Sequence, residues 1–89
     1  MNDLNKILTE RGDRYGLFAQ HAAIAQRLKG TMVTQPKWLH LAADQREALE
    51  MIQHKVARIL NGDPDYPDSW IDIAGYAQLV ADRLQGVSR

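Results

Sequence analysis

The chain has 89 residues, the size of one small domain, and its 11 Lys and Arg balance its 11 Asp and Glu. This balance excludes the basic excess that binding to nucleic acid or to an anionic membrane usually requires. The absence of cysteine excludes disulfides, thiol catalysis and Cys-based zinc sites, and it fits a reducing cytoplasm. We therefore expect one domain over residues 1–89 that is cytoplasmic and does not bind nucleic acid.

Two further properties follow from the polar N-terminus and the short length. The first ten residues contain no apolar signal core, and no stretch approaches the roughly 20 apolar residues of a membrane span. A chain of this length buries only a modest core, so a lone copy is marginally stable. We expect a homo-oligomer without a membrane partner.

The N-terminal part predicts two short helices. Apolar residues at helical spacing indicate the first over 3–11, with Gly12 as its stop and the sequence GDRYG (12–16) as a turn. The second is predicted over 17–29, with Gly30 as the residue that ends it.

The rest of the chain predicts a connector and two longer helices. The connector, 31–41, carries Pro36, and we expect its Trp38 and Leu39 to pack on the core. Apolar stripes indicate helices over 43–60 and 68–85, joined by a loop of about seven residues, a length that favours antiparallel neighbours. Three small residues on the last helix are expected to let the pair approach closely: Ala74, Ala77 and Ala81. The prediction is an all-α fold, a small helical bundle.

Acidic residues follow the polar side of the two long helices. Glu47 and Glu50 lie on the first of the pair, and Asp68 and Asp72 lie four apart on the second. An antiparallel hairpin can bring the two rows together, and four carboxylates are a ligand set for Mg²⁺ or Mn²⁺. The spacing therefore raises a metal-site hypothesis.

Three other interpretations of the same acids stay open, and one of them is that Glu50 forms a surface pair with His54 or Arg58 along its own helix. Asp44 with Glu47, and Ser69 with Asp72, fit capping boxes, and Asp68 fits an N-cap. Alternatively, Asp72 or Asp68 forms an ion pair with Lys55 or Arg58 across the hairpin. The apolar neighbours of Asp72 favour a partner of one kind or the other.

Basic and aromatic residues supply candidate ligand contacts. Lys55 and Arg58 can hold a phosphate next to a metal, with Tyr76 one turn beyond Asp72. Arg14 and Tyr15, in the glycine-bracketed turn, are further candidates, although such a turn is also a common structural feature. The three histidines have no metal-type spacing and are interpreted as packing or surface residues: His21, His40 and His54. Trp38 and Trp70 are interpreted as core anchors.

Three motifs resemble a family of short phage and prophage proteins with no assigned activity. They are Gly12-Asp13-Arg14-Tyr15-Gly16, Lys55-Val56-Ala57-Arg58 and Asp68-Ser69-Trp70-Ile71-Asp72-Ile73-Ala74-Gly75-Tyr76. The likeness covers nearly the whole chain. It implies a phage accessory protein that works in the cytoplasm of the host bacterium.

A more distant similarity is to the MazG-like, all-α nucleotide pyrophosphohydrolases. Glu47-Ala48-Leu49-Glu50 matches the first E-x-x-E pair of that group, whereas the second pair departs from it because Asp68 and Asp72 are four residues apart. The likeness implies Mg²⁺ held by Glu47, Glu50 and Asp72, with Lys55 and Arg58 on the phosphates of a nucleotide. A base would stack on Trp38 or Tyr15, and a dimer or tetramer would complete the site.

Two functions follow from these patterns. One is a Mg²⁺-dependent nucleotide pyrophosphohydrolase, or a degenerate relative that still binds nucleotides. The other is a non-catalytic protein that binds a host protein or sequesters a nucleotide signal. The incomplete acid motif means that the fold carries over from the resemblance and hydrolysis does not.

Overall fold

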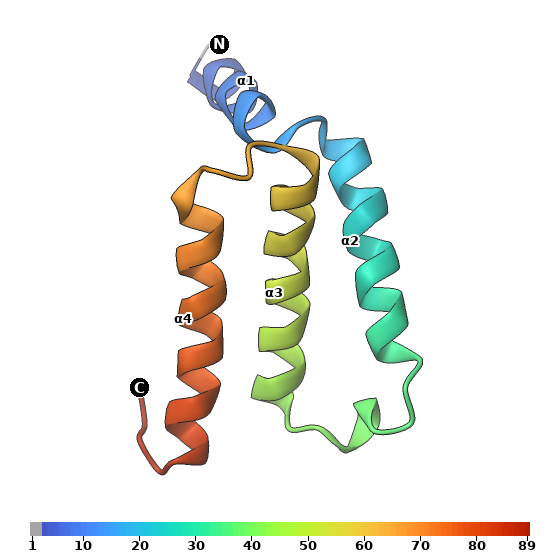
Figure 1. Ribbon diagram of the computed structural model, residues 1–89, viewed down its shortest axis with the longest axis vertical. Coiled ribbons are helices and arrows are strands. Elements are labelled where there is room, and N and C mark those ends of the chain that lie inside the picture. The colour runs from blue at the N-terminus through green and yellow to red at the C-terminus, as the bar shows by residue number, and fades with distance from the viewer. Residues whose placement is uncertain (1–2) are drawn as a thin grey trace.

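The computed structural model describes residues 3–89, and every regular element in that range is helical (Figure 1). The elements are α1 (Asp3–Tyr15), α2 (Phe18–Val33), the short 3₁₀ helix η1 (Trp38–His40), α3 (Ala43–Asn61) and α4 (Pro67–Leu84). The all-α prediction is confirmed. The two C-terminal helices are the longest and pack against each other, as expected.

Three helices lie side by side in one layer, with α3 in the middle (Figure 1). The chain runs down α2, up α3 and down α4, so neighbouring helices are antiparallel. Helix α1 lies at one end of the layer, where it contacts α2 and α3. We call this the upper end; the C-terminus lies at the opposite, lower end. No described helix is long and apolar enough to cross a membrane.

The buried core between the helices of this layer is small. The buried apolar residues of the described chain are Ala25, Trp38, Ala48 and Ala57. Ala48 and Ala57 belong to α3, and small side chains on the middle helix let both neighbours approach it. No large described side chain is fully buried. The radius of gyration, 15.1 Å, exceeds the roughly 12 Å typical of a compact chain of this length.

Two predicted helix ends in the N-terminal half are wrong. Helix α1 continues through Gly12 to Tyr15, and the residue that ends it is Gly16, with φ of 77° and its N–H bonded to the carbonyl of Gly12 at 2.9 Å. Helix α2 likewise continues through Gly30. A glycine inside a helix costs about 1 kcal/mol relative to alanine, which neighbouring helical turns can offset.

The boundaries of the C-terminal helices lie within one residue of the prediction, but their caps differ. At the start of α3 the Gln45 side chain accepts a hydrogen bond from the Ala42 N–H at 2.9 Å, so the Asp44–Glu47 capping box is wrong. Pro67 opens α4, which places Asp68 inside the helix rather than at its N-cap. Neither Asp44 nor Asp68 is therefore the N-cap residue of its helix.

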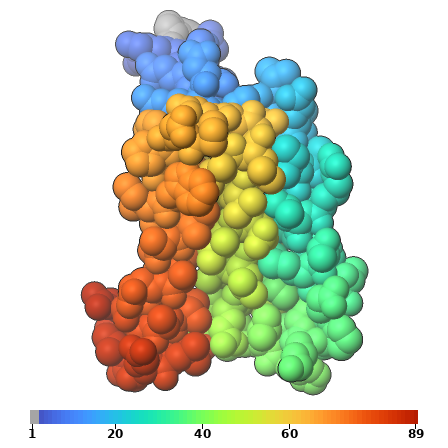
Figure 2. Space-filling view, in the orientation of Figure 1, coloured from blue at the N-terminus to red at the C-terminus, as the bar shows by residue number. Residues whose placement is uncertain are grey.

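Several apolar residues expected to pack against a neighbouring helix are exposed, because in a single layer α4 and α1 have few neighbouring helices. Ala74, Ala77 and Ala81 are exposed, as are Leu39 and, in α1, Leu4, Ile7 and Leu8. Trp38 is buried as predicted, but Trp70 is half exposed and its Nε1–H donates to the Pro64 carbonyl at 2.8 Å. The face of the molecule shown in Figure 2 carries parts of all three layer helices.

Candidate functional site

The upper end is built from two connections that pack backbone to backbone. The Asp63 N–H donates to the Arg14 carbonyl at 2.7 Å, and Asn61 Nδ2 donates to the carbonyls of Tyr15 and Leu17 at 2.8 and 3.0 Å. A Cβ at Gly62 would collide with the backbone of Arg14 and Tyr15. The α1–α2 turn and the α3–α4 loop therefore form one rigid platform.

Two arginines and two tyrosines lie on this platform. The Arg58 guanidinium lies over the Tyr15 ring at 4.2 Å, and the Arg14 guanidinium lies over the Tyr66 ring at 4.5 Å. The two tyrosine rings meet edge to face at 6.2 Å. Aromatic faces attract cations, so each ring holds its guanidinium group in place. We call these four residues the arginine–tyrosine cluster.

The hydroxyl of Tyr66 links an arginine to a carboxylate. Arg14 Nη1 donates to this oxygen at 2.9 Å, and a hydrogen bond with the Asp68 carboxylate raises the pKa of Tyr66. Asp68 is therefore a partner of the tyrosine, in neither a cap nor an ion pair within residues 3–89.

A cavity of about 250 Å³ opens beside the cluster. Its lining contains three arginines and two carboxylates: Arg11, Arg14, Arg58, Glu10 and Asp68. None of the three arginines is in an ion pair within the part of the chain that the structure describes. The cavity therefore carries a net positive charge and several guanidinium donors, which can accept an anion.

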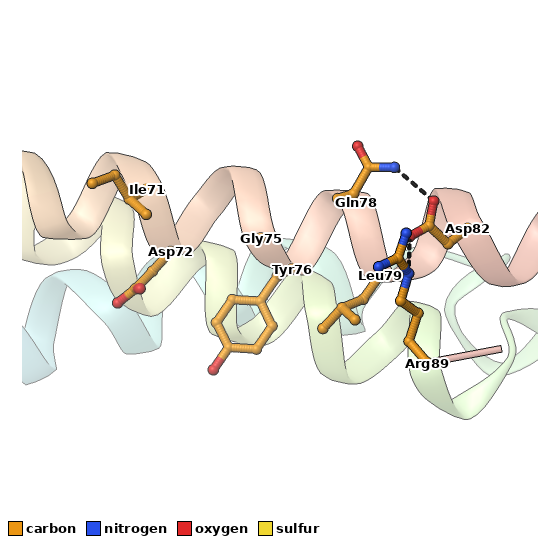
Figure 3. A pocket seen from close by; sticks show the side chains of 8 residues that line it. All are labelled: Ile71, Asp72, Gly75, Tyr76, Gln78, Leu79, Asp82 and Arg89. Atoms are coloured by element: carbon orange, nitrogen blue, oxygen red, sulfur yellow. Dashed lines mark hydrogen bonds and ion pairs between the residues drawn. The ribbon is translucent and has the colours of Figure 1, made fainter. Parts of the chain in front are cut away.

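The predicted substrate residues are only partly brought together. Arg14, Tyr15 and Arg58 meet in the cluster. Lys55 lies almost one turn below Arg58 and forms an ion pair with Asp72, at 3.1 Å between Nζ and Oδ2. Tyr76 lies further along α4, on the same side as Asp72 (Figure 3), and lines other cavities.

The predicted metal ligands do not form a cluster. Asp72 is paired with Lys55, whose side chain is only 12% exposed, and Asp68 faces the arginine–tyrosine cluster. Glu47 lines a different cavity with Arg83, and Glu50 is partly buried on α3. Within residues 3–89, no three histidine or acidic side chains lie close enough to hold a metal ion. The metal site stays a prediction. Asp72 would have to leave its ion pair with Lys55 before it could bind a metal ion.

The lower end carries ion pairs that sequence spacing did not indicate. Arg83 Nε and Nη2 donate to the two oxygens of Asp44 at 2.7 and 2.6 Å, which joins α4 to the start of α3. This hydrogen bonding lowers the pKa of Asp44. Asp82 is buried, accepts a hydrogen bond from Gln78 at 2.6 Å and forms an ion pair with Arg89 at 2.8 Å (Figure 3). Arg83 and Arg89 are therefore neutralised by ion pairs at this end.

Sequence reasoning missed two features of the upper end. Tyr66 was not a candidate, because its contacts with Arg14 and Tyr15 arise only when the α3–α4 loop packs on the α1–α2 turn. His21 and His54 were interpreted as separate residues, yet their rings meet edge to face with centroids 4.5 Å apart. They are 33 positions apart in sequence, so only the pairing of α2 with α3 could reveal the contact.

Comparisons with known proteins give a family and no activity. Residues 1–84 match the family described as Domain of unknown function (DUF6378). No curated protein and no solved structure matches this chain.

Proposed function

We propose that this chain, which belongs to the DUF6378 family of domains of unknown function, binds a nucleotide by its phosphates without hydrolysing it. One observation carries the proposal: Arg14 and Arg58 lie over tyrosine rings, and neither is in an ion pair within residues 3–89. A guanidinium group matches two phosphate oxygens at once. Tyrosine rings also supply a surface on which a base stacks.

Nucleotide binding is favoured over hydrolysis because Asp72, one of the predicted metal ligands, is already in an ion pair. Hydrolysis through Mg²⁺ would need Asp72 together with Glu47, Glu50 or Asp68, whereas Asp72 neutralises Lys55. Release of Asp72 would leave a largely shielded ammonium group unpaired, which is costly. Mg²⁺-dependent pyrophosphohydrolysis is thus the alternative, supported by the similarity of Glu47 and Glu50 to the MazG-like pair.

Calorimetric titration separates the two functions. The ligands are a nucleoside triphosphate, the matching nucleoside and pyrophosphate, each with Mg²⁺ and with EDTA. The proposal predicts that the triphosphate and pyrophosphate bind in EDTA and that the nucleoside binds much more weakly. Arg58→Gln should weaken triphosphate binding about tenfold, because one charge-assisted bidentate contact is lost.

Arg27→Gln is the matched control. Arg27 is exposed on α2, and its Nε donates only to a carbonyl of its own helix at 3.4 Å, so its removal should leave binding unchanged. No phosphate binding, or equal losses in both variants, would contradict the proposal. Pyrophosphate release that needs Mg²⁺ and disappears in Asp72→Ala would instead establish the alternative.

The setting that we propose is the cytoplasm of a host bacterium. The phage-type motifs noted above support an accessory protein that keeps a nucleotide signal from its receptor. A host protein as the partner is a separate outcome: it would be indicated by a complex that forms in host extract and persists in Arg58→Gln.

We also propose that a second copy of the chain covers α4. The surface area is 6334 Å², about 1,000 Å² above the value typical of a monomer of this mass, while each side of a standard interface buries roughly 800 Å². Ile71 and Leu79 are at least half exposed on either side of Gly75 (Figure 3). A Cβ at Gly75 would touch nothing, so no contact within the described chain requires the glycine, whereas close approach of a second copy would.

Sedimentation velocity tests the second copy. Ile71→Glu should shift the chain to monomer, because a charge would be buried at the interface. Leu39→Glu is the control, since Leu39 is equally apolar and exposed but lies in η1. A wild-type chain that stays monomeric, or a dimer that Ile71→Glu does not weaken, would contradict this assignment.

A further inference from the structure

A second cavity, which adjoins the 250 Å³ cavity described above, lies where α1, α2 and α3 converge at the upper end. It measures about 510 Å³. Its wall is mainly apolar, with Leu8 from α1, Leu17 from the turn and Phe18 from α2. The polar groups on it are Arg11 and Tyr15 from α1, His21 from α2, and His54 and Arg58 from α3.

His21 lines this cavity, and one of its ring nitrogens has no hydrogen-bond partner within the described chain. The residue is 4% exposed, and the nitrogen without a partner is Nδ1. Its ring packs between Phe18, at 5.9 Å, and His54, at 4.5 Å. The nitrogen itself is shielded from solvent, so His21 contributes its ring rather than this atom to the cavity wall.

The charges around the two imidazoles are all positive. Burial, followed by the charges of Arg58, Lys29 and Lys55, lowers the pKa of His21. Burial is also the main reason that the pKa of His54 falls to about 4. Both rings are therefore neutral at pH 7, which leaves Arg58 and Arg11 as the charged groups of the lining. Lys55 is already neutralised by Asp72.

We propose that this cavity binds a small organic anion, with one carboxylate and an aromatic or branched apolar body. The carboxylate would lie against Arg58 and the apolar body against Leu8, Leu17 and Phe18. A divalent cation is disfavoured, because cations surround the two imidazoles and no carboxylate lines the cavity.

The two cavities share Arg11, Tyr15 and Arg58 and differ in their other residues. Phe18, His21 and His54 line only the second cavity, while Arg14, Tyr66 and Asp68 line only the first. Variants can therefore separate the binding of an apolar carboxylate from the binding of a phosphate, so this inference stands or fails independently of the proposed nucleotide site.

Nuclear magnetic resonance titration with benzoate tests the inference. Benzoate should shift the ring signals of His21 and His54 saturably, whereas benzyl alcohol, which keeps the ring and loses the charge, should not. Bound benzoate should also raise the pKa of His54, because a nearby anion favours the charged imidazole. Besides burial, this pKa is lowered by His21 and Lys29 on α2 and by Arg58 and Lys55 on α3, while α1 presents Arg11 and Tyr15 to the cavity.

Phe18→Ala is the test variant, because Phe18 is 77% exposed and its loss should not unfold the chain. It should weaken benzoate binding about fivefold or more, since it removes apolar area from the contact. Leu39→Ala, at an equally exposed residue in η1, should have no effect. Arg14→Gln should weaken pyrophosphate binding and leave benzoate binding unchanged.

Three results would overturn the inference. The first is an absence of saturable shifts at His21 and His54 up to the solubility of benzoate. The second is equal binding of benzyl alcohol, which would indicate an apolar cleft without an anion subsite. The third is an equal loss in Phe18→Ala and Leu39→Ala, which would place benzoate elsewhere on the molecule.

Discussion

The two ends of the helical layer are held together by different forces. At the upper end, backbone hydrogen bonds and two closely packed glycines, Gly16 and Gly62, join the connections, while the arginines lie on aromatic rings. At the lower end, Arg83 and Arg89 are in ion pairs with Asp44 and Asp82. Fixed geometry with unneutralised charge suits ligand binding, whereas neutralised charge suits a structural role.

The largest expected effect is steric and belongs to the upper end. Gly62→Ala should lower the free energy of unfolding by about 3 kcal/mol, because its Cβ would overlap the backbone of Arg14 and Tyr15. Urea denaturation measures the change. Gly30→Ala is the control: its Cβ meets open space within α2, so it should stabilise the chain by about 0.5–1 kcal/mol. Similar losses in both variants would mean that the platform is not tightly packed.

The next effect lies between the two ends, at the Lys55–Asp72 pair. Asp72→Ala should cost about 2 kcal/mol, because it leaves the shielded Lys55 ammonium unpaired. Lys55→Met in the same background should recover most of the loss by removing the charge. A loss in Asp72→Ala no larger than that in Asp44→Ala, which breaks the exposed pair with Arg83, would assign both ion pairs to open surface.

A smaller effect depends on pH. The pKa of His54 is about 4 in the folded chain and 6.5 without burial, so between these values the unfolded chain binds a proton that the folded chain does not. The free energy of unfolding should therefore fall as the pH is lowered through this window, by about 1–2 kcal/mol, allowing for solvent that reaches the partly buried ring. Equilibrium unfolding at several pH values measures the slope.

His54→Gln should flatten this part of the pH profile. His40→Gln should leave it unchanged, because His40 is exposed in η1 and distant from the histidine pair. An unaltered slope in His54→Gln would assign the pH dependence to other groups.

Sequence periodicity predicted the bounds of the two long helices but not the contacts at the upper end. Apolar spacing located α3 and α4 to within a residue. The helix ends predicted at Gly12 and Gly30 are wrong because a glycine can remain inside a helix. A Cβ at either position would meet open space. Gly16 ends α1 with a positive φ where a Cβ would collide with Asn61, and this contact with a distant segment is not visible in the sequence.

The candidate site was predictable only where its residues share a local motif. Arg14 and Tyr15 were visible as neighbours in one turn, and Arg58 as a cation between the apolar residues Val56 and Ile59. Their meeting with Tyr66, and the meeting of His21 with His54, depend on how the helices pack. The rows of acids looked like a site because spacing cannot distinguish an ion pair from a ligand set, and Lys55 competes for Asp72.

The central claim is that Arg14 and Arg58 at the upper end are available to an anion, whereas Arg83 and Arg89 at the lower end are held in ion pairs. Titration of the ¹⁵N-labelled chain with pyrophosphate, observed at the arginine Nε–H signals, tests it most directly. We predict saturable shifts at Arg14 and Arg58 and none at Arg83 and Arg89. Equal shifts at both ends, or no shift at Arg58, would contradict the account.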